Sequence, residues 1–184
     1  AVNTGLAAGT TINNSATTAS STTDPVAGNN TGTATTAVIV GPNLAKAFNP
    51  PAVPPNSVST LTFTVTNPNP GVGLTGVSFT DNLPAGMEVA GTPNVVNGCG
   101  GSVTASPAGT SIVVSGITLA PGASCTVAVD VLATGLGSLV NTTDAVTSTN
   151  GGTGNQATAT LVSIVNVNEP FQLLVADTNN HRIQ

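Results

Sequence analysis

The stretch STLTFTVT, residues 59–66, has a threonine at every second position and sets Leu61, Phe63 and Val65 between the threonines. Successive side chains of a β-strand point to opposite faces of a sheet, so the three apolar residues would share one face. This alternation predicts a strand with one buried face and one solvated face, as in an antiparallel sheet.

Segments of the same kind lie on both sides of this stretch. Residues 77–81 and 111–114 are short runs rich in strand-forming residues, and residues 125–132 alternate again. Turn formers separate them, as in the NPNPG segment at 67–71, and no longer window keeps a helical apolar stripe. About seven or eight short strands divided by turns predict an all-β, immunoglobulin-like β-sandwich over residues 41–165.

The segments that flank this domain have their own patterns. Residues 1–40 predict an N-terminal β-hairpin, which is marginally stable alone. Its GTTINNS segment, residues 9–15, recurs as GSLVNTT at residues 137–143, so the hairpin resembles the last two strands of a preceding repeat and could act as donor strands. Residues 166–184 read as a linker and a strand-like tail.

Composition excludes several functions. Seven acidic residues against one lysine and one arginine give a net charge of −5, so no basic patch for nucleic acid is expected. No apolar run reaches the roughly 20 residues of a membrane span. A Thr/Asn-rich, lysine-poor chain with two cysteines is typical of secreted or cell-surface bacterial proteins. Because the chain begins with Ala1, we expect a processed product or a fragment.

The cysteines and glycines indicate structure rather than catalysis. Cys99 and Cys125 are most simply a disulfide, contributing ~3.5 kcal/mol in the chain-entropy description, because a catalytic thiol needs a base and the one histidine, His181, lies in the tail. One histidine and two cysteines make no zinc-ligand spacing, so no metal is expected. The GVGLTG segment at 71–76 matches a dinucleotide fingerprint by letter but leads into a strand, so no cofactor is expected.

Lys46 is the one lysine, and it falls between Leu44 and Phe48 on the apolar face of a predicted strand. Burying an unpaired ammonium costs several kcal/mol, so Lys46 either extends to solvent at a strand end or has a partner inside. Asp81 and Asn141 interrupt the apolar faces of two other predicted strands in the same way. Three such interruptions together predict a site.

The chemistry that fits this site is a self-formed isopeptide bond. Burial favours uncharged groups, and a neutral Lys46 amine is a nucleophile, while a protonated Asp81 can polarise the Asn141 carboxamide as a helper. The alternative is a buried Lys46–Asp81 pair that Asn141 satisfies, a weak stabilising device. Asn13 repeats the position of Asn141 and is the alternative acceptor, on the hairpin of a neighbouring chain. We favour Asn141, because the complete domain supplies its own late strand.

Three segments carry a resemblance to a known family. LAKAF at 44–48, FTDNLPAG at 79–86 and VNTT at 140–143 resemble the bacterial conserved-repeat family of Ig-like domains, which occur in tandem in large surface and adhesin-like proteins. The resemblance covers residues 41–165, and residues 9–40 resemble the end of another copy. It implies an Ig-like fold at the cell surface.

The same resemblance bears on the candidate residues. The CGG segment at 99–101 and the SCT segment at 124–126 resemble the cysteine-containing branch of the family. The family's proposed Lys–Asn crosslink with an acidic helper would fall on Lys46, Asn141 and Asp81.

The tail resembles something else. Its LVADTNNHRIQ segment, from Leu174 to Gln184, looks like one strand of an NHL β-propeller repeat. Each propeller blade needs four strands, so the tail is either the stump of a further domain or a strand with another use.

These observations predict a non-enzymatic structural module outside the cell, part of a stalk, fibre or filament. Exposed sheet edges accept strands, so copies of the chain or neighbouring repeats could join head to tail by strand donation. The alternative is an adhesin domain that binds a glycan or a protein, although the chain lacks the aromatic residues such sites use. No acid–base pair lies outside the crosslink site, so no enzyme is predicted.

Overall fold

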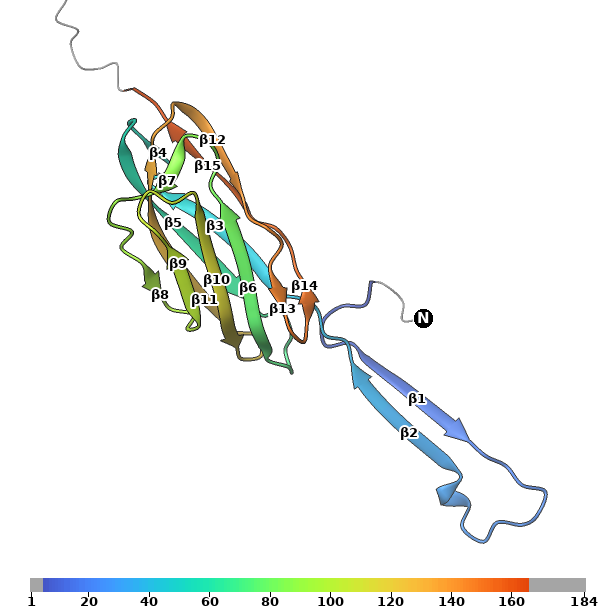
Figure 1. The fold of residues 1–184 in the computed structure, drawn as a ribbon. Coiled ribbons are helices and arrows are strands. Elements are labelled where there is room, and N and C mark those ends of the chain that lie inside the picture. The colour runs from blue at the N-terminus through green and yellow to red at the C-terminus, as the bar shows by residue number, and fades with distance from the viewer. Residues whose placement is uncertain (1–4, 166–184) are drawn as a thin grey trace, which may run out of the picture.

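The computed structural model describes residues 5–165, which form a β-sandwich with a β-hairpin projecting from one end (Figure 1). The neighbours in the first sheet follow the order β14-β13-β6-β10-β9. These strands are β6 (Leu74–Asn82), β9 (Ser102–Ala105), β10 (Ser111–Leu119), β13 (Thr147–Ser148) and β14 (Gly152–Thr153).

The second sheet packs against the first and has the order β3-β5-β11-β7, with β8 also paired to β11. Its strands are β3 (Asn43–Asn49), β5 (Ser57–Thr66), β7 (Met87–Val89), β8 (Val96–Asn97) and β11 (Ser124–Ala133). β5 and β11 pair antiparallel along their whole length, from Ser57 opposite Ala133 to Thr66 opposite Ser124. β3 is the edge strand of this sheet and pairs with one strand only, β5.

A third, smaller sheet connects the edges of the other two. It consists of β12 (Gly137–Thr142), β15 (Thr158–Ser163) and β4 (Ala52–Val53), in the order β12-β15-β4. β15 lies beside β3 of the second sheet. On its other side, Thr143 at the end of β12 forms an isolated antiparallel bridge with Asp81 of β6. The late strands therefore close the side of the sandwich on which β3 lies.

The core lies between the sheets, as the alternating stretch predicts. Leu61, Phe63 and Val65 are fully buried, while the intervening threonines are partly exposed. Val127 and Val129 of β11 are buried opposite them. An all-β Ig-like sandwich is thus confirmed.

Two predictions are wrong, one on the length of a strand and one on the number of strands. The predicted strand at 111–114 continues to Leu119, because β10 has a register irregularity between Val114 and Ile117 where Gly116 has a φ of 72°. This bulge moves the buried positions from even to odd residue numbers, which breaks the period that the sequence shows. The prediction of about seven or eight strands is also too low, since thirteen lie between Asn43 and Ser163, several of only two to four residues.

The N-terminal hairpin consists of β1 (Thr11–Thr17) and β2 (Thr31–Ala37), joined by a loop with a short 3₁₀ turn, η1 (Ala27–Asn29). The two strands pair antiparallel with each other and, within residues 5–165, with no third strand. The described chain therefore has the hairpin at one end and the last residues of β15 toward the opposite end (Figure 1).

The division into segments 1–40, 41–165 and 166–184 stays a prediction. The linker and NHL-like tail at 166–184 lie outside the described residues. Within residues 5–165, no helix is long and apolar enough to cross a membrane.

Candidate crosslink site

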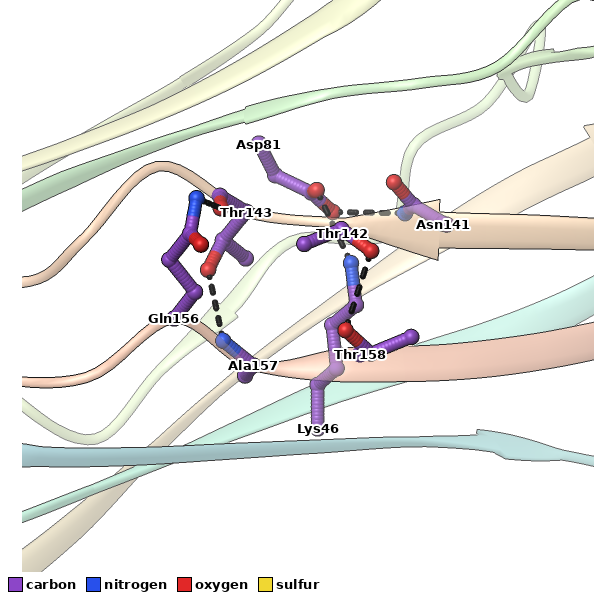
Figure 2. A network of polar contacts seen from close by, with 8 residues as sticks. All are labelled: Lys46, Asp81, Asn141, Thr142, Thr143, Gln156, Ala157 and Thr158. Atoms are coloured by element: carbon purple, nitrogen blue, oxygen red, sulfur yellow. Dashed lines mark hydrogen bonds and ion pairs between the residues drawn. The ribbon is translucent and has the colours of Figure 1, made fainter.

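Lys46 and Asp81 form an ion pair in the interior of the sandwich. The Lys46 Nζ atom lies 2.9 Å from Asp81 Oδ1, and both side chains are fully inaccessible to solvent (Figure 2). Lys46 comes from β3, with Leu44 and Phe48 buried on either side of it. Asp81 comes from β6 of the opposite sheet, so the pair joins the two layers.

Asn141 completes the group from the third sheet. Its Nδ2 atom donates a hydrogen bond of 2.8 Å to Asp81 Oδ2, and the residue is 0% exposed. One carboxylate thus holds the Lys46 amine at one oxygen and the Asn141 carboxamide at the other, as Figure 2 shows. The structure brings together the three residues that the sequence singles out, one from each sheet.

The other end of the Asn141 carboxamide lacks a partner. Its Oδ1 atom is buried and accepts no hydrogen bond. An unpaired buried acceptor costs about 1–3 kcal/mol. Turning the carboxamide over would bring Oδ1 to Asp81 Oδ2, and this contact is favourable only when Asp81 carries a proton. The Asn141 carbonyl oxygen is therefore free to accept a hydrogen bond from a proton donor.

Apolar groups surround the lysine. The Lys46 Nζ atom lies 6.0 Å from the centroid of the Phe63 ring, and Phe63 in turn packs against Phe79 with their centroids 5.1 Å apart. Burial lowers the pKa of Lys46 below its ordinary value, although the hydrogen bond and the charge of Asp81 oppose this shift. A lower pKa increases the fraction of uncharged, nucleophilic amine.

The end of β12 is held by contacts that fix Asn141. Thr143 forms the backbone bridge to Asp81, and its hydroxyl oxygen accepts a hydrogen bond of 3.0 Å from the Ala157 N–H. Gln156 Nε2 donates to the Thr143 carbonyl oxygen at 3.0 Å. The hydrogen bonds of Thr143 to Ala157 and Gln156, drawn in Figure 2, secure the turn between β12 and β15.

Asn155 holds β3 in a similar way. Its Nδ2 atom donates to the Leu44 carbonyl oxygen at 2.8 Å, and its Oδ1 atom accepts from the Leu44 N–H at 2.9 Å. The side chain thereby occupies the place of a neighbouring strand two residues before Lys46. Sequence reasoning missed Asn155, because an asparagine in a Gly/Asn segment reads as a turn former and nothing in the sequence marks its partner.

The remaining candidates lie elsewhere. Asn13 is exposed on β1, where its Oδ1 atom accepts a hydrogen bond of 3.1 Å from Thr35 Oγ1. Cys99 and Cys125 form the predicted disulfide, between the loop after β8 and the start of β11. No group of three metal-ligating side chains occurs among residues 5–165.

Comparison with known protein families finds one whose sequence model matches the sandwich. The family described as "Domain of unknown function (DUF7933)" matches residues 42–163, a segment that contains Lys46, Asp81 and Asn141 but not Asn13. No curated protein matches the chain in sequence. The more specific resemblances to the conserved-repeat family and to an NHL repeat stay predictions.

Solved structures show the same fold at low identity. A cohesin module from a family 33 glycoside hydrolase of Clostridium perfringens is 10% identical, with a TM-score of 0.51, and the match covers 68% of this chain and 98% of the module. A variant of BcpA, the major pilin subunit of Bacillus cereus, is 14% identical, with a TM-score of 0.50, over 72% of this chain. The match spans 46% of that pilin. At these identities the likeness concerns the fold alone.

Proposed function

The chain belongs to the DUF7933 family, and we propose that it is a structural, non-enzymatic module of an extracellular bacterial stalk, fibre or filament, closed by an amide bond between Lys46 and Asn141. The observation that carries this proposal is the buried contact of Lys46, Asp81 and Asn141, which joins three sheets. The Asn141 carbonyl oxygen has no hydrogen-bond partner, so it is open to a proton donor in the reaction.

The reaction uses only groups that the site holds. The Lys46 ammonium passes a proton to Asp81 along their 2.9 Å hydrogen bond. The amine lone pair attacks Cγ of Asn141 while the protonated Asp81 donates to the carbonyl oxygen, and one further proton passes from the Lys46 nitrogen through Asp81 to the departing nitrogen. The Cγ–Nδ2 bond breaks, the Nζ–Cγ bond forms, and ammonia leaves. Asp81 retains the proton that Lys46 gave up, so atoms and charge balance.

The position of this bond suits a load-bearing module. The chain enters the sandwich at β3 and leaves it after β15, toward the opposite end (Figure 1). Tension along the chain would reach Lys46, cross the amide to Asn141 and continue into β15. Residues 47–140, which contain most of the core and the disulfide, would carry no tension.

Assembly by strand donation is the finer part of the proposal. The hairpin has two strands and no third partner within residues 5–165, and β9 is an edge strand of the first sheet. Unpaired edges accept strands from other chains, and a head-to-tail contact that does not close gives a fibre. The Bacillus cereus protein of similar fold is by name a major pilin subunit, which supports a role in a filament.

The position of the aromatic side chains favours this function over the adhesin alternative. Phe48, Phe63 and Phe79 are all buried, and the chain has no Trp or Tyr. The described surface therefore offers no aromatic ring on which a sugar could stack.

Intact mass tests the proposal. The denatured and reduced chain should be lighter than its sequence by one ammonia, and fragments that contain Lys46 and Asn141 should remain joined after digestion. The isosteric Asp81→Asn variant lacks the proton carrier, so it should have the unmodified mass. An unmodified mass in the wild-type chain would show that Lys46 and Asp81 are only an ion pair.

A further inference from the structure

The hairpin β1–β2 repeats the pair β12–β15 in geometry as well as in sequence. Gly9 and Gly137 both have positive φ, 78° and 97°, and each comes at or just before the start of its strand. Four residues later come Asn13 and Asn141. A positive φ is a backbone requirement that the letters alone do not show, so the two glycines are an independent sign that the strands begin in the same way.

The second strands also correspond. Asn13 lies opposite Thr35 in β2, and Asn141 lies opposite Ala159 in β15, both in antiparallel pairs. Aligning the strands on these positions matches the threonines and the valine that follow, TAV at 36–38 against TLV at 160–162. The hairpin is therefore equivalent, residue by residue, to the two strands that close the sandwich.

The surroundings of the two asparagines differ. Asn141 is fully buried against the Lys46–Asp81 pair, whereas Asn13 is exposed and bonded to Thr35 within its own hairpin. The chain has no second lysine, and Lys46 is already paired with Asp81, the same carboxylate that accepts from Asn141. The hairpin thus carries an acceptor asparagine without a donor, and the donor has to come from outside this sandwich.

We propose that Asn13 is the acceptor of a second crosslink, whose lysine and acid belong to another sandwich body of this kind that lacks its own last two strands. This inference rests on the crosslink chemistry proposed for Lys46 and Asn141. The hairpin would insert where β12 and β15 lie in this chain. The body's lysine amine would displace the Asn13 carboxamide nitrogen as ammonia, and the body's acid would retain the lysine proton.

The contacts of β12 and β15 identify this partner. The surfaces that receive them are all built from the earlier part of the domain: β6 through the Asp81–Thr143 bridge, β4 through its parallel pairing with β15, and β3 beside β15. Ser15 stands at the position of Thr143 and keeps its hydroxyl group. Such a body has the shape, the edges and the lysine that the hairpin needs.

A two-body chain tests the proposal. Residues 41–136 are placed directly before Gly9 of the full chain, so that the added body has no late strands except β1 and β2. If the hairpin completes that body, the intact mass should fall by two ammonia molecules. Asn13→Ala should reduce the loss to one, and the matched Asn14→Ala, on the opposite face of β1, should leave it at two.

Two results would overturn the proposal: a loss of one ammonia that Asn13→Ala does not alter, or proteolysis of the added body while the original sandwich resists. Failure of the proposed function is distinguishable, because the single chain would then have an unmodified mass. In that case two other measurements still report whether the hairpin folds onto the added body. The added body should resist protease, and its cysteine pair should form a disulfide, only if β1 and β2 complete its fold.

Discussion

Asn69 pairs with Val40 as a neighbouring strand would. Its Nδ2 atom donates to the Val40 carbonyl oxygen and its Oδ1 atom accepts from the Val40 N–H, both at 2.9 Å. Asn69 is 1% exposed, and Asn67 Oδ1 accepts a further hydrogen bond from it at 2.8 Å. Val40 lies in the segment that joins the hairpin to the sandwich, so the buried Asn69 side chain holds this junction against the sandwich.

Replacing Asn69 should loosen this junction. Asn69→Ala leaves both backbone groups of Val40 without partners, which should lower the free energy of unfolding by about 1–3 kcal/mol. It should also increase the motion of β1 and β2 relative to the sandwich, measured by ¹⁵N relaxation. Asn14→Ala, at an exposed position of β1, is the control. Unchanged relaxation of the hairpin in Asn69→Ala would show that other contacts hold the junction.

Asn155 should affect the rate of bond formation. It holds the Leu44 backbone, and Asn155→Ala would free the part of β3 that aims Lys46 at Asp81. We expect the ammonia loss to proceed several-fold more slowly after refolding of unmodified chain, followed as intact mass against time. Asn14→Ala, at an exposed position of β1, should leave the rate unchanged. Equal rates in the two variants would show that Asn155 does not position Lys46 for the reaction.

The alkaline pH dependence of stability should reveal whether Lys46 is free. The chain has one lysine and no tyrosine, and its cysteines are paired. The pKa of Lys46 is lowered from 10.5 by burial, so the unfolded chain binds more protons than the folded chain between the lowered pKa and 10.5. Stability must therefore rise with pH in that window when the amine is free.

The comparison uses chains with and without the bond. Asn141→Ala, which keeps the free amine, should become more stable toward guanidinium as pH rises to 10.5, whereas the crosslinked wild type should show no such rise. The double variant with Lys46→Met should lose the rise. The idea fails if wild type and Asn141→Ala follow the same pH profile.

The fold and the site could be predicted to the extent that they follow the two-residue period of strands. Leu61, Phe63 and Val65 mark the core by that period, and Lys46, Asp81 and Asn141 stand out because they interrupt it. The period fails at Gly116, where the bulge shifts the buried face of β10 by one residue. Asn69 and Asn155 could not be predicted, because each pairs through its side chain with a backbone segment far away in sequence.

Tension applied to a single molecule gives the most direct test of the load-bearing role. With the disulfide reduced, Asp81→Asn should release residues 47–140 on unfolding, which extend by roughly 300 Å at about 3.4 Å per residue. In the crosslinked wild type these residues cannot extend, and only the strands outside the amide can be pulled out, a release of less than ~100 Å. Oxidising the disulfide should shorten the release in Asp81→Asn, because the loop between Cys99 and Cys125 stays closed, and should leave the wild type unchanged. A full-length release in the wild type would mean that tension passes through the core and that no amide protects it.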